Sequence, residues 1–352
     1  MSCGVPQGSI LGPTLWNVLY DRILRVQMES GVSLIAYADD LAILIRGKTA
    51  IQVKEKAQFA VDIVVDELRK MGLLVEPKKS ELLIVEGRRT LVSMDLTVDG
   101  VGLSSSESVK YLGVTFDRNL RMTTHVKKTT KKALQMTNTL RKIMPNIGGP
   151  GSKNRKLLRT AVISVVAYGA PIWKSALKYQ KYANMLEAVN RKLALGVAGA
   201  YRTTGTKAIL SITGQPPIDL IIQERMEIYD KGKDFRNQAR ESLFNQWQAR
   251  WNEYNCWTKI FIRNVKEWTE SKFVRVDYYV TQALTGHGIF ATYLNNIKKL
   301  DSESCWFCGS IDTPEHCIFQ CYRFHEIRMS AAREIGTEMT KENIGDFIIS
   351  SE

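Results

Sequence analysis

Two adjacent aspartates, Asp39 and Asp40, have the clearest capacity for chemistry in this chain. They interrupt an apolar, β-prone run that extends from residue 33 to residue 45. Two like charges are costly to bury within a strand, so we expect them at the tip of a β-hairpin or on an open face. Carboxylates placed there can bind a hard cation such as Mg²⁺, and two such ions carry out in-line phosphoryl transfer on nucleic acid. The alternative is a solvated Asp-Asp turn without a ligand.

Four residues near the C-terminus have the spacing C-x2-C-x7-H-x4-C: Cys305, Cys308, His316 and Cys321. The first two can bind one metal from a tight turn, and the other two complete a tetrahedral set suited to structural Zn²⁺. Cys317 and His325 are alternative ligands, although Cys317 is adjacent to His316 and should point elsewhere. The competing interpretation is a small helical subdomain with reduced, unligated cysteines. Zinc knuckles bind nucleic acid in many proteins but can also be purely structural.

The net charge indicates a polyanionic partner. Among 352 residues, 49 Lys and Arg oppose 36 Asp and Glu, which gives a formal charge of +13. Nucleic acid is the first candidate and an anionic membrane surface the second. A hydrophobic content of 44% is enough to bury substantial cores, and the length suggests two or three structural units.

The chain shows no membrane or secretory pattern. No run reaches the roughly 18 apolar residues of a membrane helix, and the closest, residues 157–173, is interrupted by Arg159. The N-terminus has neither a basic n-region nor an apolar h-region, and six cysteines in a chain this long do not form a disulfide scaffold. We therefore expect a reducing intracellular setting, in the nucleus or the cytoplasm, and no membrane partner.

The elements that must position the aspartates lie in the first third of the chain. Apolar periodicity predicts helices over residues 9–24 and 49–71, and Gly72 ends the second of them. The acidic hairpin lies between these helices. Residues 81–85 and 111–116 are predicted to form strands, linked by a turn-rich stretch over residues 95–108.

From residue 117 the chain becomes helical and basic. Lys127, Lys128, Lys131 and Lys132 lie on one predicted helix. Further cations open a second helix after a Gly-Gly-Pro-Gly breaker: Lys153, Arg155, Lys156 and Arg159. These charges form either a solvated face or a stripe that contacts phosphates. The following Trp- and Tyr-rich region, residues 216–300, is expected to use its aromatic side chains for core packing rather than for base stacking.

Several blocks, in this order, resemble the reverse transcriptases of non-LTR retrotransposons, most closely the type-1 elements of arthropods. The palm-like blocks are Gly4-Val5-Pro6-Gln7-Gly8, Tyr37-Ala38-Asp39-Asp40, Gly72-Leu73-Leu74-Val75-Glu76-Pro77-Lys78-Lys79 and Tyr111-Leu112-Gly113-Val114. Later blocks are Ala200-Tyr201-Arg202-Thr203-Thr204, Gly214-Gln215-Pro216-Pro217 and Leu284-Thr285-Gly286-His287-Gly288. The resemblance covers essentially the whole chain, including the Cys/His pattern.

The resemblance implies an α+β fold and a domain order. Residues 1–116 would be a partial reverse-transcriptase palm, an antiparallel sheet with helices. A basic helical, thumb-like region would follow over residues 117–215, and a helical Trp/Tyr-rich connection over 216–300. A small C-terminal zinc knuckle would occupy residues 301–352.

The resemblance also implies roles for individual residues in RNA-directed DNA synthesis. Asp39 and Asp40 would bind Mg²⁺, and Lys79 would lie near the triphosphate of the incoming deoxynucleoside triphosphate. Residues that position the RNA template, the DNA primer or the nucleotide would be Gln7, Gly8, Tyr37, Tyr111, Leu112 and Gly113. Lys127, Lys128, Lys131 and Lys132 would contact the nucleic-acid backbone.

The family's palm uses a third aspartate from a strand ahead of the Pro-Gln-Gly loop, which this sequence does not include. The fingers and the endonuclease region of the family are not included either. We therefore expect little polymerase activity from this polypeptide alone. The alternatives are a nucleic-acid-binding remnant without catalysis, and an interaction protein without a nucleic-acid role.

Overall fold

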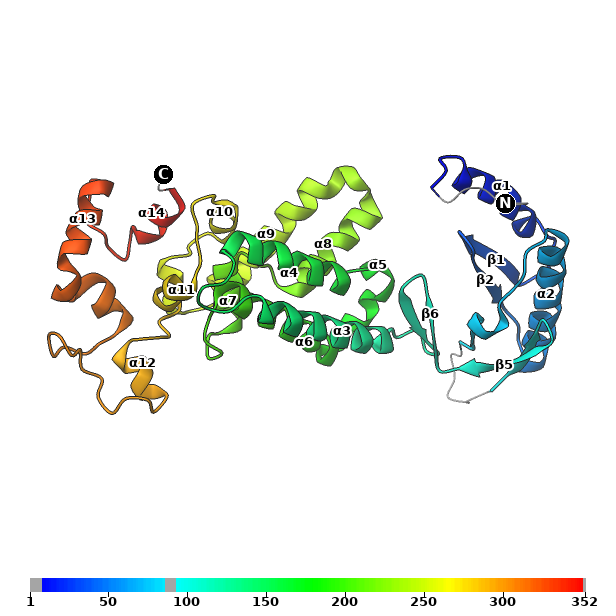
Figure 1. Cartoon of the computed structure of the whole chain (residues 1–352), viewed down its shortest axis with the longest axis horizontal. Coiled ribbons are helices and arrows are strands. Elements are labelled where there is room, and N and C mark those ends of the chain that lie inside the picture. The colour runs from blue at the N-terminus through cyan, green and yellow to red at the C-terminus, as the bar shows by residue number, and fades with distance from the viewer. Residues whose placement is uncertain (1–7, 86–92, 351–352) are drawn as a thin grey trace. The chain divides into compact units, whose positions relative to one another are not determined.

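The computed structural model describes residues 8–85 and 93–350 (Figure 1). Contacts between residues divide the chain into two compact units, Met1–Arg121 and Met122–Glu352. The finer divisions at residues 215 and 300 fall within the second unit and stay predictions.

The first unit combines helices with short strands. In chain order it contains α1 (Gly12–Leu24), β1 (Val32–Tyr37), β2 (Asp40–Ile45), α2 (Ala50–Lys70), the 3-10 turn η1 (Pro77–Lys79), β3 (Leu82–Leu83), β4 (Asp95–Val98), β5 (Val101–Ser106), β6 (Ser108–Tyr111) and β7 (Val114–Asp117). The described strands form three small sheets, β1-β2, β3-β5-β4 and β6-β7, and β3 pairs with β5 in parallel. The expectation of one antiparallel sheet is therefore not met, because tight turns close the strands into local hairpins.

Two of these hairpins differ from the strands that the sequence predicts. The stretch expected to be a link contains the β4–β5 hairpin, whose turn residues Asp99 and Gly100 both have positive φ, 50° and 77°. The strand expected over residues 111–116 is interrupted in the same way, since Leu112 and Gly113 have φ of 46° and 82°. Two consecutive positive φ values are typical of the tight turn that joins antiparallel strands.

Helix α2 has a well-defined cap at each end. The Thr49 side chain accepts a hydrogen bond from the Gln52 amide at its start. At its end Gly72 has φ of 74°, and the Leu73 amide donates to the Leu68 carbonyl at 2.9 Å. This is the Schellman geometry, in agreement with the predicted stop at Gly72.

Helices α1 and α2 form a core over the β1–β2 hairpin. The buried members of this core are Tyr20, Ile23, Val64 and Leu68. Half-buried hairpin side chains, among them Leu34 and Ile43, pack against them. The strand alternation therefore directs one hairpin face toward the helices.

The second unit is helical. Its longer helices are α3 (Thr123–Lys142), α4 (Ser152–Val166), α6 (Gln180–Ala198), α7 (Thr206–Thr213), α8 (Ile218–Lys231), α9 (Arg236–Asn252), α11 (Tyr278–Thr285), α13 (His325–Ile335) and α14 (Ile344–Ser350). Shorter elements are α5 (Ala170–Trp173), α10 (Val265–Glu270), α12 (Ala291–Asn296), the 3-10 turns η2 (Lys174–Lys178), η3 (Lys233–Phe235), η4 (Trp257–Ile260) and η6 (Tyr322–Phe324), and the π-helical turn η5 (His316–Gln320).

Tryptophans form the centre of this unit, as the sequence predicts. Trp247, Trp251 and Trp268 are almost fully buried. The indole N–H of Trp251 donates to the Ile262 carbonyl at 2.7 Å, and that of Trp268 to the Ile212 carbonyl at 3.1 Å. All three rings are therefore core residues rather than exposed stacking surfaces.

In the described part of the chain, no single helix is both long and apolar enough to span a bilayer. Helix α4 and the segment Ala170–Lys178 reach that length and composition only as a pair, bent by 50° at the break between them.

Candidate functional site

The acidic pair lies at the tip of a regular hairpin. Strands β1 and β2 are antiparallel, and Tyr37 pairs with Asp40 across the two-residue turn of Ala38 and Asp39. Both aspartates are exposed. Ala38 has φ of 54°, a left-handed conformation that costs a residue with a side chain about 1–2 kcal/mol. Strain of this kind is found where a turn must present functional groups in one arrangement.

Two aromatic side chains of α1 hold this turn through its backbone. The indole N–H of Trp16 donates to the Ala38 carbonyl at 2.9 Å, and the Tyr20 hydroxyl donates to the Asp39 carbonyl at 3.4 Å. The two rings stack on each other with centroids 5.2 Å apart. The sequence places Trp16 and Tyr20 on the apolar face of this helix, and their separation of four residues is the only sign that they act together.

The charge of the acidic pair contributes to raised pKa values of two tyrosines. Burial, followed by the charges of Asp39 and Asp40, raises the pKa of Tyr20 above its ordinary value. Burial and Asp40 likewise raise the pKa of Tyr111. The Tyr111 hydroxyl is buried and has no hydrogen-bond partner among the described residues. The structure therefore places Tyr111, a residue of the β6–β7 hairpin, near the carboxylates.

The carboxylates suit Mg²⁺ in their chemistry but not in their number. Magnesium prefers oxygen ligands, which Asp39 and Asp40 present toward solvent. Within residues 8–85 and 93–350, no third acidic, histidine or cysteine ligand gathers with this pair. The described residues therefore bring two carboxylates together at this turn.

The other predicted palm residues are dispersed around this turn or lie outside the description. Gln7 lies outside the described residues, whereas Gly8 is exposed with φ of 89°. Tyr37 is 67% exposed at the end of β1. Lys79 is exposed at the end of η1 and makes no ion pair with any described carboxylate.

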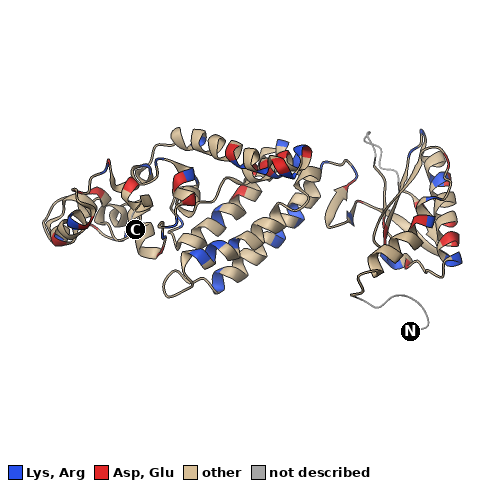
Figure 2. Cartoon of the chain, turned by 90° about the horizontal axis from the view of Figure 1, so that it is seen from above, with Lys and Arg blue, Asp and Glu red and all other residues tan. Residues whose placement is uncertain are grey.

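The four lysines predicted to contact a nucleic-acid backbone lie together on α3. Lys127, Lys128, Lys131 and Lys132 are all exposed, and none forms a salt bridge within the described chain. Lys and Arg recur along the long helices of this unit (Figure 2). The α3 charges are therefore accessible to an anionic partner.

The cations of α4, unlike the exposed lysines of α3, include buried side chains. Arg155 is buried, and its guanidinium donates to the carbonyls of Pro145, Pro150 and Gly196. Burial lowers the pKa of Arg159 to about 10. Burial also lowers the pKa of Lys156, with a further contribution from Arg159. Arg155 is thus a structural residue and not part of a phosphate-facing stripe.

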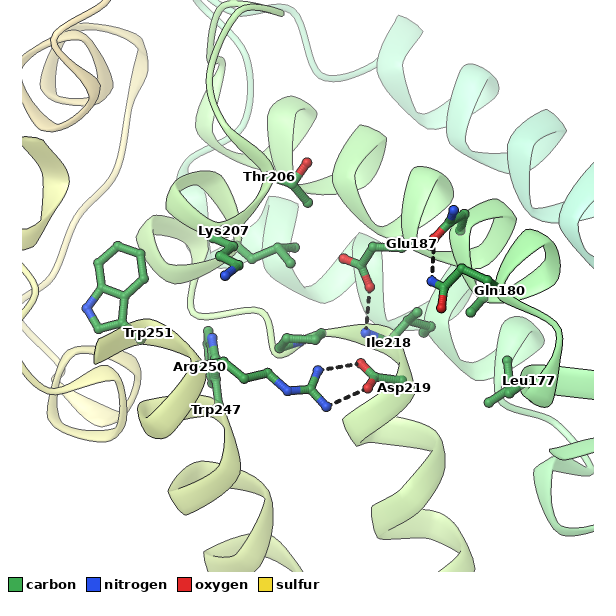
Figure 3. Close-up of a pocket in the computed structure, with 14 residues that line it drawn as sticks. Leu177, Gln180, Glu187, Thr206, Lys207, Ile218, Asp219, Trp247, Arg250 and Trp251 are labelled. Atoms are coloured by element: carbon green, nitrogen blue, oxygen red, sulfur yellow. Dashed lines mark hydrogen bonds and ion pairs between the residues drawn. The ribbon is translucent and has the colours of Figure 1, made fainter. Parts of the chain in front are cut away.

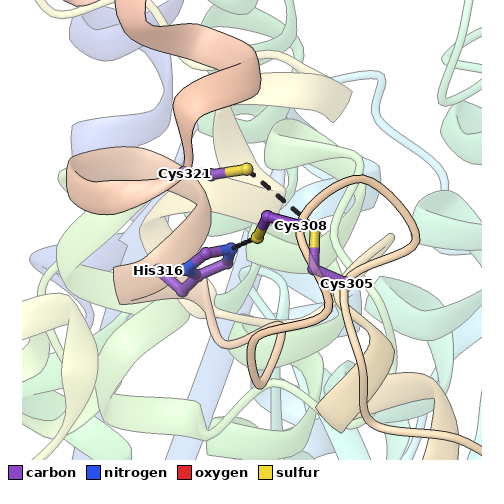
Figure 4. Close-up of side chains that lie close together, drawn as sticks. All are labelled: Cys305, Cys308, His316 and Cys321. Atoms are coloured by element: carbon purple, nitrogen blue, oxygen red, sulfur yellow. Dashed lines mark hydrogen bonds between the residues drawn. The ribbon is translucent and has the colours of Figure 1, made fainter.

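The C-terminal cysteines and histidine converge as a metal centre requires. Ligand atoms of Cys305, Cys308, His316 and Cys321 all lie within 4.8 Å of one another (Figure 4). The Sγ atoms of Cys305 and Cys321 are 3.9 Å apart, and Sγ of Cys308 is 3.3 Å from Nε2 of His316. Tetrahedral zinc with Zn–S bonds of about 2.3 Å separates its sulfur ligands by about 3.8 Å. The donor set and its spacing therefore fit zinc.

The two alternative ligands lie outside this cluster. Burial raises the pKa of Cys317 to about 11, which disfavours the thiolate that binds metal. His325 stacks against Tyr322 with ring centroids 5.3 Å apart. By contrast, hydrogen bonds from Ser310 lower the pKa of Cys308 to about 7. His316 begins a π-helical turn, an irregularity that occurs frequently at functional sites.

A pocket of about 540 Å³ lies among α6, α7, α8 and α9 (Figure 3). Arg250 forms two hydrogen bonds with Asp219. Glu187 accepts a hydrogen bond from the Ile218 amide at 3.0 Å, which caps the start of α8 after Pro217. Burial raises the pKa of Glu187. These groups satisfy one another, so the polar lining serves the packing of four helices.

A family match covers the first unit, whereas similar proteins align with most of the chain. Residues 1–116 match the family described as Reverse transcriptase (RNA-dependent DNA polymerase). The chain is 28% identical to the "Retrovirus-related Pol polyprotein from type-1 retrotransposable element R1 2" of Nasonia vitripennis, over 92% of this chain and 86% of the relative. It is 25% identical to the "Putative 115 kDa protein in type-1 retrotransposable element R1DM" of Drosophila melanogaster, over 92% of this chain but 34% of that protein. No solved structure matches the chain significantly.

Proposed function

Because this chain carries a reverse-transcriptase domain and is related over most of its length to Pol polyproteins of non-LTR retrotransposons, we propose that it extends a DNA primer on an RNA template as part of such an enzyme. The observation that carries the proposal is the braced turn of Asp39 and Asp40, which lies within the matched residues. An exposed acidic pair on such a turn would supply part of the metal site that a metal-dependent nucleotidyl transfer uses.

Asp39 and Asp40 would hold Mg²⁺ through their exposed carboxylates. Two bound magnesium ions would activate the attacking 3′-hydroxyl and stabilise the charge on the leaving pyrophosphate. Lys79 would assist the departure of pyrophosphate by donating a proton from its ammonium group. Tyr111, Leu112 and Gly113 would form the hairpin that positions the primer end.

The loop ahead of α1 would receive the template and the incoming nucleotide. Gly8 has open space where a Cβ atom would lie, so the backbone can approach a ligand closely. Gln7 would act beside it. Tyr37, exposed at the end of β1, would also contact the primer.

Template and primer would also be held by the second unit. The unpaired lysines of α3 suit phosphate contacts, which are independent of sequence and weaken with salt. Cys305, Cys308, His316 and Cys321 would hold structural Zn²⁺ and so tie the C-terminal loops together. This part supports nucleic-acid binding without catalysis as a second candidate function of the chain.

The proposal is tested by primer extension with the purified 352-residue chain, a labelled DNA primer on an RNA template, deoxynucleoside triphosphates and Mg²⁺. We expect the chain to bind the primer–template but to extend it only slightly, because two carboxylates lack the ligand that bridges both metal ions. Asp39→Asn should remove the remaining extension.

Robust DNA synthesis by the unmodified chain would show that no third carboxylate is needed. Undiminished synthesis by the Asp39→Asn variant would overturn the role of the acidic turn. Failure to bind the primer–template at all would overturn the proposed function.

A further inference from the structure

The loops that carry the metal-ligand cysteines also carry exposed aromatic rings. Trp306 is 76% exposed and Tyr322 is 73% exposed. Each follows a ligand cysteine directly in sequence, Trp306 after Cys305 and Tyr322 after Cys321. Large rings turned so fully toward water on neighbouring loops are characteristic of interaction surfaces.

Each of these rings has a partner that fixes its orientation. The guanidinium of Arg323 lies over the Trp306 ring, 4.4 Å from its centroid. The imidazole of His325 stacks on Tyr322 with an interplanar angle of 9°. The high exposure of both rings shows that these partners leave much of each ring surface accessible. A ring held in this way loses little conformational freedom when a further flat group stacks on it.

The metal-ligand cluster brings these rings together. The loops around residues 306 and 322 meet at Cys305 and Cys321, whose Sγ atoms are 3.9 Å apart. Contact between Arg323 and Trp306 crosses between the same two loops. Metal binding would therefore fix Trp306 and Tyr322 relative to each other.

The charge beside the rings selects the class of partner. Arg323 forms no salt bridge with a described carboxylate, so its charge stays available to an anion. Aromatic faces beside an unpaired cation match the alternation of bases and phosphates in a nucleic-acid strand. A duplex hides the faces of its bases, whereas a single strand exposes them.

We propose that Trp306, Arg323 and Tyr322 form a stacking platform for the unpaired bases of single-stranded nucleic acid. This proposal rests on the proposed function, because it assumes that the chain handles nucleic acid. It goes further in assigning the metal-bound C-terminal loops to single strands and in naming the side chains that bind them. Arg323 serves twice, since it orients Trp306 and contacts a phosphate.

The test is fluorescence anisotropy with the zinc-loaded full chain, using one labelled oligonucleotide both as a single strand and as a duplex. We expect Trp306→Ala and Tyr322→Ala each to weaken single-strand binding roughly tenfold, since each removes one stacking contact. Trp306→Phe should retain most of the affinity because it keeps a ring. Duplex binding should be unchanged, and the loss should persist at higher salt because stacking is not a counterion effect.

Tyr229 supplies the matched control, because it is 74% exposed on α8, outside the metal-ligand loops. Tyr229→Ala should leave both affinities unchanged. The thiolate absorption of bound Co²⁺ shows whether each variant still holds metal, and only variants that keep this signal enter the comparison. If Trp306→Ala loses it, Trp306→Leu and Tyr322→Ala carry the test.

The outcomes separate this inference from the proposed function. A chain that binds neither single strands nor duplexes would overturn both. Normal single-strand binding by metal-loaded Trp306→Ala and Tyr322→Ala variants would overturn the platform and leave the proposed function intact. Equal losses for single strand and duplex would also overturn the platform, because they would indicate phosphate contacts instead of stacking.

Discussion

At the scale of single residues, the acidic turn depends on groups that do no chemistry themselves. Ala38 adopts a conformation that favours glycine, and the Trp16 indole donates to its carbonyl at 2.9 Å. Tyr20 donates to the next carbonyl, that of Asp39. These bonds offset part of the strain and fix the directions in which the two carboxylates leave the backbone.

Removal of the Trp16 indole N–H should therefore lower the metal affinity of the turn more than it lowers the free energy of unfolding. We expect Trp16→Phe to lower the Mn²⁺ affinity of the acidic turn about fivefold, corresponding to about 1 kcal/mol for the lost hydrogen bond. The measurement is the electron paramagnetic resonance signal of free Mn²⁺ during titration, with Asp39→Asn as the variant without a site.

A double-mutant cycle with Ala38→Gly separates positioning from general destabilisation. Glycine adopts positive φ without strain, so Trp16→Phe should cost clearly less affinity when residue 38 is glycine. An equal loss in both backgrounds would contradict the role of Trp16 as a brace of this turn.

Arg155 is a cation that stabilises the fold, in contrast to the exposed lysines of α3. Its guanidinium satisfies three carbonyls, so Arg155→Ala should lower the free energy of unfolding by about 2–4 kcal/mol. The exposed neighbour Lys153 is the control, and Lys153→Ala should change stability by less than about 0.5 kcal/mol. Equal urea midpoints for the two variants would contradict this assignment.

Sequence reasoning located the residues with chemistry better than those that support them. The placement of Asp39 and Asp40 at a hairpin tip follows from the cost of burying two charges in a strand. The brace could not be predicted, because apolar spacing shows which face Trp16 occupies but not which carbonyl its N–H reaches. The burial of Arg155 could not be predicted, because its partners are carbonyls of a loop and of α6, which leave no pattern in the sequence.

At the scale of elements, turns decide where the predicted and observed strands differ. Asp99-Gly100 is a strong hairpin signal and forms the β4–β5 turn, where the turn-rich composition alone predicts a link. The C-terminal cap of α2, in contrast, is predictable from the sequence, since the helix ends at Gly72 as expected. The partner of each short strand depends on contacts distant in sequence, so the pairing of β3 with β5 could not be predicted.

The packing of α3 should make the second unit sensitive to acid. His125 is buried on α3, with Nε2 3.3 Å from the Thr129 hydroxyl, and burial lowers its pKa below the ordinary value of 6.5. Above pH 6.5 both folded and unfolded chains carry the neutral ring. As the pH falls below 6.5, the unfolded chain binds the proton more readily, so stability declines.

Urea unfolding between pH 7 and pH 5 measures this effect. Burial also lowers the pKa of His287. His125→Gln should therefore flatten the pH dependence of the free energy of unfolding only in part. The double variant with His287→Gln should flatten it further. An unaltered slope in the double variant would contradict this account.

At the scale of the whole molecule, the chain divides into a unit with the acidic turn and a helical unit with the exposed lysines and a Cys3His cluster that could hold a metal. The boundary between the two units follows Arg121, close to residue 116, where the palm-like region is predicted to end. Sequence patterns predicted the positions of the acidic turn and of the cysteine and histidine cluster, because both depend on residue type and spacing. The finer domain order stays a prediction.

In the proposed function, Asp39 and Asp40 hold metal at the end of a bound primer. Iron(II) can replace magnesium between carboxylates, and with ascorbate and peroxide it generates radicals that cut the nearest backbone. In the presence of an RNA template and a DNA primer, we expect cuts in the protein at residues 36–42 and in the primer at its 3′ end. Excess Mg²⁺ and Asp39→Asn should each abolish them.

Asp66→Asn is the matched control, because Asp66 and Glu67 form another adjacent acidic pair, on α2, and are paired with Arg69 and Lys70. This variant should leave all cuts unchanged. Cleavage of both protein and primer that depends on Asp39 is the predicted result. No cleavage at the turn, or the same cleavage in the Asp39→Asn variant, would contradict the claim.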